Sequence, residues 1–308
     1  MMLYPDIINI VATYLNLADF YKIKDIFNLS VRFYCKNINQ IIDIYWASYD
    51  GYLDVVKYLY SIGQKCTSRS LENAYKQKNF DMIKYLYSVN VKPSPHCIDI
   101  LCRNGNLHDI KYIHSLDINC TRTHRGINNA CQKGHLHVVK YLHSIGIRGT
   151  SNAMDYASKN GHLDVIKYLR SLNYGCTHMA IYWASRRGYV DIIKYLDSIH
   201  SVGINNSMHW ACRKGHLNVV KYLHSVKQKI TESDMNWASR NGHLNVVKYL
   251  HSIGIICTSD SINWASRKGH LDVVQFLHQI GVKHTHYAIK YSKCNGYLEI
   301  NTFLCKSY

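Results

Sequence analysis

The sequence has 308 residues, with 37 lysines and arginines against 20 aspartates and glutamates, which gives a formal net charge of +17. Such a charge predicts acidic partners, whether protein, nucleic acid or anionic lipid. Eleven cysteines are scattered without a CxxC pair, and there is no secretory leader and no run of about 18 apolar residues. We therefore expect reduced thiols, an intracellular location in the cytoplasm or nucleus, no secretion and no membrane span.

Residues 1–40 form a segment of their own, in which Ile7, Ile8, Val11 and Leu15 recur at helical spacing. A Pro-Asp start, this helix, an Asn-Leu-Ala-Asp-Phe turn at residues 16–20 and a Val-Arg-Phe segment at residues 31–33 follow in order, which resembles an F-box. The resemblance implies docking on the adaptor subunit of a cullin-type ubiquitin ligase. The residues that would dock are Pro5, Ile8, Val11, Leu15 and Phe20. Alternatively, the apolar face only caps the first unit of the array that follows.

The remaining segment, residues 41–308, repeats one string. WASRKGHLDVVQFLHQIG at residues 264–281 returns with few changes at residues 237–254, and again at residues 46–63. The glycine before His-Leu, or its equivalent, recurs after 27 residues in eight of nine steps. The exception, from Gly105 to Gly134, spans 29 residues and indicates an insertion within residues 121–126. A fixed period of this size predicts a solenoid of about ten units.

Each unit predicts two antiparallel helices. In the copy at residues 258–281, Thr258 is a candidate N-cap, Gly269 ends the first helix, and apolar residues from Leu271 onward define the second. Lys78 stands where the other repeats have glycine, so we expect the second repeat to be the weakest part of the array.

The string GHLDVVKYLHSIG is similar to the second half of an ankyrin repeat. The ankyrin Thr-Pro-Leu-His start is absent, and the unit is about six residues shorter than the usual 33, at the place of the β-hairpin. We therefore expect an all-α, ankyrin-like helical solenoid with shortened or absent β-hairpins, preceded by a small helical F-box-like cap. Short-unit arrays behind such a start resemble ankyrin repeat proteins of giant DNA viruses of the mimivirus type. That resemblance implies an adaptor in an infected host, and we expect a monomer.

Histidine and cysteine also follow the repeat. Equivalent residues of successive units lie about 10 Å apart, so repeated histidines do not converge on one ion. We expect the first histidine column to form hydrogen bonds between helices, and no metal, cofactor or enzymatic centre, because catalysis needs one unique constellation. The first column comprises His135, His162, His216, His243 and His270, and a second comprises His114, His143, His224, His251 and His278.

All five tryptophans occupy one column of the repeat, and basic residues follow three or four positions later, within reach of the indole. In ankyrin arrays the matching columns border the concave, partner-facing surface. The candidate groove residues are Trp183, Arg186, Arg187, Trp210, Arg213, Lys214, Trp237, Arg240, Trp264, Arg267 and Lys268. The indoles either fill the space of the missing hairpin beside solvated cations, or they line a groove for an acidic protein segment or single-stranded nucleic acid. Nucleic acid is the weaker alternative because no established nucleic-acid motif is present.

A row of lysines recurs in the second helix, often three residues after an aspartate, as in Asp54 with Lys57. This spacing predicts a solvated ridge with short-range ion pairs. Together, these patterns predict a non-enzymatic protein–protein interaction adaptor, and the F-box resemblance implies that it recruits a client to a ubiquitin ligase. The alternative is a plain ankyrin scaffold that competes for a host partner without ubiquitin machinery.

Overall fold

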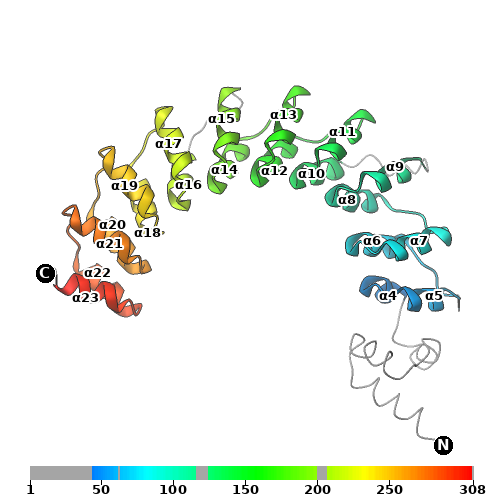
Figure 1. Cartoon of the computed structure of the whole chain (residues 1–308), viewed down its shortest axis with the longest axis horizontal. Helices are drawn as coiled ribbons and strands as arrows, with labels where there is room; N and C mark the ends of the chain where they lie inside the picture. Colours follow the sequence, from blue (N-terminus) through cyan, green and yellow to red (C-terminus); the bar gives the residue numbers. More distant parts are fainter. Residues whose placement is uncertain (1–43, 62, 116–123, 200–206, 307–308) are drawn as a thin grey trace, which may run out of the picture. The chain divides into compact units, whose positions relative to one another are not determined.

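The structure, a computed structural model, describes residues 44–61, 63–115, 124–199 and 207–306 (Figure 1). The F-box-like segment, with Pro5, Ile8, Val11, Leu15 and Phe20, lies outside the described residues. The chain divides into two compact units, Met1–Gly126 and Ile127–Tyr308. This boundary falls at the end of the insertion that the sequence places within residues 121–126.

The described residues fold into helices and no strand, which confirms the predicted all-α class. In the first unit, three helix pairs are described: α4 (Ile44–Asp50) with α5 (Leu53–Ser61), α6 (Ser68–Gln77) with α7 (Phe80–Ser88), and α8 (Pro95–Asn104) with α9 (Leu107–Ser115). The boundary between the units lies within the first turn of α10 (His124–Lys133), which pairs with α11 (Leu136–Ser144). The next pairs of the second unit are α12 (Asn152–Asn160) with α13 (Leu163–Ser171), and α14 (His178–Arg187) with α15 (Val190–Ser198). The remaining pairs are α16 (Ser207–Lys214) with α17 (Leu217–Ser225), α18 (Glu232–Arg240) with α19 (Leu244–Ser252), α20 (Ser259–Lys268) with α21 (Leu271–Gln279), and α22 (His286–Cys294) with α23 (Leu298–Lys306).

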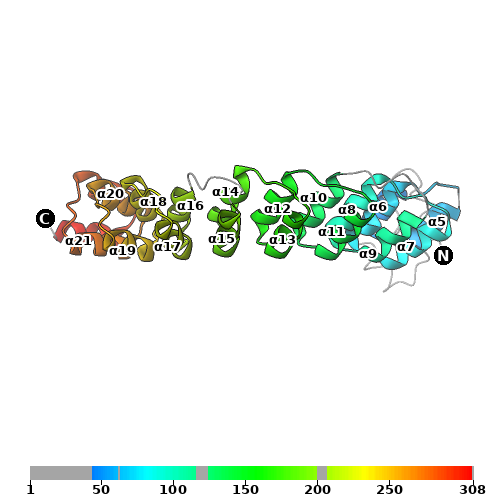
Figure 2. The same ribbon diagram turned by 90° about the horizontal axis from the view of Figure 1, so that it is seen from above.

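Two layers of helices make up the second unit (Figures 1 and 2). The first helices α12, α14, α16, α18, α20 and α22 contact one another in series, and so do the second helices α15, α17, α19, α21 and α23. The core lies between the layers. In one repeat it contains Met235 and Ala238 of α18 with Val246, Val247 and Leu250 of α19, all fully buried. Burying one large apolar side chain contributes about 1.5–3 kcal/mol, so stacking of successive repeats supplies most of the stability.

The ends of the helices follow the sequence signals. Thr258 is the N-cap residue of α20 with extended backbone, and Gly269 ends that helix at φ +83°, in the left-handed region. Thr177 caps α14 with its side chain, because its hydroxyl accepts a hydrogen bond of 3.1 Å from the backbone N–H of Met179. The short connector therefore places the first helix of the following repeat without a β-hairpin.

Hydrogen bonds between repeats hold the N-cap residues. The backbone N–H and the hydroxyl of Thr177 donate to the two carboxylate oxygens of Asp155, at 2.9 and 2.7 Å. Asn263 occupies the equivalent position of α20 and accepts from the backbone N–H and hydroxyl of Thr285 at 3.2 Å each. These contacts span 22 residues and join the first helix of one repeat to the start of the next.

We expect Lys78→Gly to raise the free energy of unfolding by about 1 kcal/mol. Lys78 ends α6 at φ +56° and ψ +35°, a left-handed conformation in which glycine avoids the clash of a Cβ atom. Urea unfolding monitored by circular dichroism measures the change. The control Lys76→Gly, inside the last turn of α6, should instead lower stability by about 1 kcal/mol. Equal loss in both variants would contradict the strain at Lys78.

Candidate partner-binding surface

The first helices of the second unit place tryptophan and arginine on one face. Trp183 and Arg186 of α14 are three residues apart, and the same spacing occurs in α16, α18 and α20. Residues three apart on a helix are neighbours. The four tryptophans are half-buried, so each ring packs on the array and keeps an exposed part.

Each guanidinium group also contacts the aromatic ring of the next repeat, which produces a continuous Trp–Arg ladder. We define it as Trp183, Arg186, Trp210, Arg213, Trp237, Arg240, Trp264, Arg267 and the terminal Tyr291. The Cζ atoms of Arg186, Arg213, Arg240 and Arg267 lie 5.2, 4.9, 4.8 and 5.2 Å from the indole centroid of their own repeat. The distances to the ring of the following repeat are 5.2, 4.3, 4.4 and 4.8 Å. All are within the range of cation–π attraction.

The ladder arginines are not neutralised by acidic side chains. None of the four forms an ion pair with a carboxylate of a described residue. Asp155 and Asp234 lie in the same helix layer, but both are buried and accept hydrogen bonds from threonines. In the described part of the chain, the only hydrogen bond of a ladder guanidinium runs from Arg186 to the Tyr182 hydroxyl, at 3.2 Å. This face therefore presents positive charge, and most guanidinium N–H donors of the ladder have no hydrogen-bond acceptor among the described residues.

Several candidate residues lie outside this arrangement. Arg187, Lys214 and Lys268 are exposed and are not among the cations that lie over a ring. Trp46 belongs to the first unit, is 54% exposed, and contacts Tyr45 and Tyr49 edge-on. It is thus separate from the ladder, although it shares the tryptophan column of the repeat.

Spacing within one helix predicts none of the contacts between repeats, and two of these contacts add Lys159 and Tyr291 to the candidate residues. Lys159 Nζ lies 4.2 Å from the Trp183 centroid, and Arg267 reaches Tyr291 at 4.8 Å. Both follow from the 27-residue period, because the basic position of one repeat contacts the aromatic position of the next. Comparing neighbouring repeats, and not only positions within one helix, would have found them.

Three histidines of the first column connect their repeats to the preceding ones. The Nε2 atoms of His216, His243 and His270 lie 3.0, 3.0 and 3.1 Å from the backbone carbonyl oxygens of Arg186, Arg213 and Arg240. The same rings cover the glycine that ends the preceding first helix. A Cβ on Gly215 would lie 2.5 Å from Nδ1 of His243. Interhelix hydrogen bonding, as predicted, is confirmed for these three histidines.

Acid is expected to weaken the array at His243. Burial is the main cause that lowers the pKa of His243 below 6.5, and the hydrogen bond to the Arg213 carbonyl opposes it. Below pH 6.5 the unfolded chain therefore binds more protons than the folded chain. The free energy of unfolding should fall as pH drops from 6.5 through the folded pKa, with no contribution from this group above 6.5.

Urea unfolding at pH 7.5 and pH 5.5 tests this expectation. His243→Asn is the comparison variant, because Asn79 naturally occupies the same column and donates to the carbonyl of Gly51 at 3.2 Å. The variant should lose less stability on acidification than the original chain. An identical loss in both chains would show that His243 does not carry the effect.

The second helices carry a different set of contacts. Their lysines are exposed, as the predicted solvated ridge requires, but the ion pairs predicted within one helix are not formed. The Nζ atoms of Lys57, Lys140, Lys167, Lys194, Lys221 and Lys248 lie 5.6–5.9 Å from the centroid of the aromatic ring in the next repeat. No ion pair joins Asp54 to Lys57, Asp164 to Lys167 or Asp191 to Lys194. Cation–π attraction across repeats replaces the ion pairs predicted within one helix.

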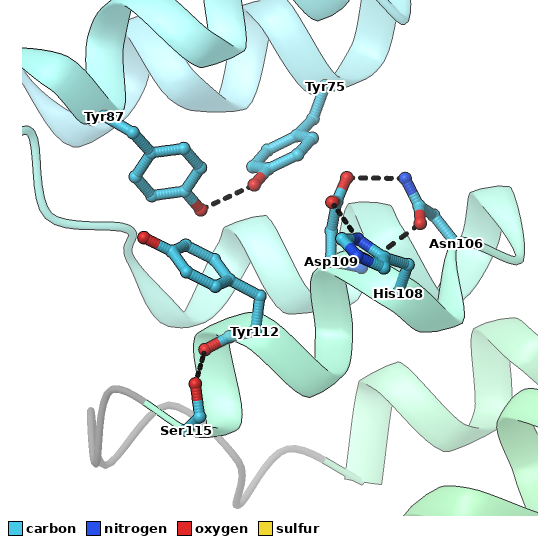
Figure 3. Close-up of polar contacts among 7 residues, drawn as sticks. All are labelled: Tyr75, Tyr87, Asn106, His108, Asp109, Tyr112 and Ser115. Atoms are coloured by element: carbon cyan, nitrogen blue, oxygen red, sulfur yellow. Dashed lines mark hydrogen bonds and ion pairs between the residues drawn. The ribbon is translucent and has the colours of Figure 1, made fainter.

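Figure 3 shows a polar cluster of the first unit, in which the hydroxyls of Tyr75 and Tyr87 share a hydrogen bond of 2.6 Å. Burial raises the pKa of both phenols, that of Tyr87 to about 12. Nearby, the Asn106 side chain accepts from the backbone N–H of Asp109 at 3.2 Å, which caps the start of α9. Both phenols stay protonated at neutral pH, so the cluster fixes helices and supplies no nucleophile.

Three of the described cysteines are equally unsuited to nucleophilic chemistry. Burial raises the pKa of the Cys66 thiol to about 11 and that of Cys131 to about 12, and it also raises that of Cys212. The thiolate is the reactive form, so these groups are unreactive at neutral pH. Among the described residues, no group of three or more His, Cys, Asp or Glu side chains could hold a metal ion. None of the described helices is long and apolar enough to cross a bilayer.

Comparison with known proteins identifies the repeat. Residues 98–179 match a family model described as ankyrin repeats in three copies, and residues 208–251 match one described as ankyrin repeats in many copies. The predicted resemblance to ankyrin repeats is therefore confirmed on these two segments. Among solved structures, the human ASB11 ankyrin repeat domain is similar over 52% of this chain and 84% of its own, with 18% identity and a TM-score of 0.44. A comparison with curated proteins gives no match. Ankyrin repeats are protein–protein interaction modules.

Proposed function

We propose that the chain is a non-enzymatic scaffold whose second unit binds an acidic segment of a partner protein along the Trp–Arg ladder. The observation that carries the proposal is the row of four guanidinium groups held on half-buried indoles without carboxylate partners. Indole contacts restrict the arginine side chains, so a ligand carboxylate meets donors whose rotamers are already limited. Arginine forks recognise carboxylates by paired hydrogen bonds.

The arrangement favours an acidic protein over stacked single-stranded nucleic acid. Stacking needs an accessible aromatic face. Trp210, Trp237 and Trp264 each already contact two guanidinium groups. A base would have to displace a cation before it could stack on an indole, whereas a carboxylate can bind the guanidinium N–H groups in place.

Binding of polyglutamate to two matched triple variants of the full chain tests the proposal. One variant carries Arg186→Gln, Arg213→Gln and Arg240→Gln. The other carries Lys194→Gln, Lys221→Gln and Lys248→Gln. Both lose three positive charges, on opposite helix layers. The ladder variant loses six cation–π contacts and the lysine variant loses three.

The ladder variant should lose about tenfold or more in affinity, because three contacts of about 0.5 kcal/mol each disappear together. The lysine variant should lose less than about threefold, through the weaker long-range field alone. Circular dichroism before titration confirms that both variants keep their helices. Equal losses would show that net charge, and not the ladder, attracts acidic ligands.

We further propose that residues 1–40 dock on the adaptor subunit of a cullin-type ubiquitin ligase in the host cytoplasm or nucleus, through Pro5, Ile8, Val11, Leu15 and Phe20. Support comes from the F-box-like order of the sequence and from resemblance to giant-virus ankyrin repeat proteins. Host adaptor should co-purify with the intact chain and not with an Ile8→Asp, Leu15→Asp double variant. Equal recovery would remove this part of the proposal.

The second candidate function is a scaffold that competes for a host partner without ubiquitin machinery. It is favoured by the ladder itself, which lies wholly in the second unit and involves no residue of the F-box-like segment. Deletion of residues 1–40 separates the two candidates. If client binding and biological effect both survive the deletion, the plain scaffold is the function.

A further inference from the structure

The spacing of the guanidinium groups restricts the conformation of an acidic ligand, an inference that rests on the proposed function. The Cζ atoms of Arg213 and Arg240 lie 4.3 and 4.8 Å from the same Trp237 centroid. They can therefore be no more than about 9 Å apart, in keeping with the usual distance between packed helices.

The neighbouring steps are similar. Arg186 and Arg213 lie 5.2 and 4.9 Å from the Trp210 centroid, and Arg240 and Arg267 lie 4.4 and 5.2 Å from that of Trp264. Each step is thus limited to about 10 Å, and the whole row from Arg186 to Arg267 to about 29 Å. A ligand that contacts all four arginines must present four carboxylates within that length.

Regular backbone conformations differ in how well they meet this condition. An α-helix presents one face at about 5.4 Å after one turn and at about 11 Å after two, so neither spacing matches the usual distance of about 8–10 Å between packed helices. A β-strand presents one face every two residues, at about 6.7 Å, or every four, at about 13 Å, and matches no better. A polyproline II helix has three residues per turn and rises about 3.1 Å per residue, so every third side chain shares one face at about 9.3 Å. Three such steps take about 28 Å, within the limit.

The low entropy cost of ordering also favours this conformation, because a polyproline II backbone is already ordered before binding. The rings of Trp210, Trp237 and Trp264 each lie between two guanidinium groups, so they set the spacing of the cations that meet the ligand carboxylates. We propose that the Trp–Arg ladder binds an acidic polyproline II segment of a partner protein in which a carboxylate recurs at every third residue.

Two synthetic peptides of identical composition test this proposal on the intact chain. One is four repeats of Glu-Pro-Pro, and the other has four glutamates in one block followed by eight prolines. Fluorescence anisotropy of labelled peptides gives both affinities at low and at moderate salt. The periodic peptide should bind about tenfold tighter or more, because contacts in register form together within one complex. Its affinity should fall with salt, as expected for exposed charge pairs.

The outcomes separate this proposal from the proposed function. If both peptides bind with equal affinity, and both lose affinity for the Arg186→Gln, Arg213→Gln, Arg240→Gln variant, the three-residue spacing is overturned. The proposal that the ladder binds an acidic partner then still stands. Binding of the periodic peptide that survives in this variant overturns both. No binding of either peptide at low salt also overturns the spacing proposal. Tighter binding of a twelve-nucleotide oligouridylate than of the periodic peptide would assign the ladder to nucleic acid instead.

Discussion

Replacement of Gly242 by alanine is expected to lower the free energy of unfolding by about 1.5–3.5 kcal/mol. Gly242 has φ +74°, where a Cβ costs about 1–2 kcal/mol. The added atom would also lie 2.5 Å from Nδ1 of His270 and 2.8 Å from its Cγ, so the ring must move. Movement breaks the contact of His270 Nε2 with the Arg240 carbonyl oxygen at 3.1 Å, a loss of about 0.5–1.5 kcal/mol.

Gly254→Ala is the matched control. Gly254 has a similar φ of +85°, but nothing lies within 4 Å of the position that an added Cβ would take, so only the backbone cost of about 1 kcal/mol remains. Because long repeat arrays do not unfold in two states, hydrogen exchange of α18 to α21 should accompany urea unfolding. Equal effects of the two substitutions would show that the histidine ring adapts and that the glycine is needed for its φ alone.

Asp155→Ala is expected to lower the free energy of unfolding by about 3 kcal/mol. The carboxylate is 5% exposed and accepts two hydrogen bonds from Thr177, which in turn caps α14. Hydrogen bonds to a charged group contribute about 1.5–3 kcal/mol each, and the substitution leaves two part-buried donors of Thr177 without this acceptor. Faster hydrogen exchange at the start of α14 would report the local loss.

Asp155→Asn should cost less than about 1 kcal/mol. Asn263 already makes the equivalent pair of contacts with Thr285, and Asn128 accepts from the backbone N–H of Thr150 at 3.3 Å. At this position of the repeat, an oxygen that accepts hydrogen bonds is therefore more important than a negative charge. If the asparagine variant is as unstable as the alanine variant, the charge itself stabilises the start of α14.

The helices and their ends can be predicted from the sequence because they depend on residues close together in the chain. The 27-residue period places Gly269 at the end of a first helix, and its φ of +83° agrees. The sequence of a single repeat explains this glycine only by the backbone conformation that it allows. At Gly215 the ring of His243 is a second reason, and it comes from the following repeat.

Lateral contacts between repeats are the part that sequence patterns describe poorly. Spacing within one helix predicts Arg186 near Trp183, but it lies equally close to Trp210, at 5.2 Å from each centroid. The same kind of spacing predicts Lys57 near Asp54, whereas it lies over Tyr85. Spacing along a helix identifies neighbours on one cylinder, but the partner on the next cylinder depends on how the helices stack.

The alternation of indole and guanidinium also bears on how such an array can change in length. Each repeat contributes one ring and one cation, and each cation bridges to the ring of the following repeat. Duplication or loss of a whole 27-residue unit therefore leaves every remaining bridge intact and changes the row by one cation. Partial units would break the alternation at the point of insertion. Gene duplication in whole units could thus lengthen or shorten the ligand that the row accommodates, by about three residues of polyproline II at a time, without redesign of any single repeat.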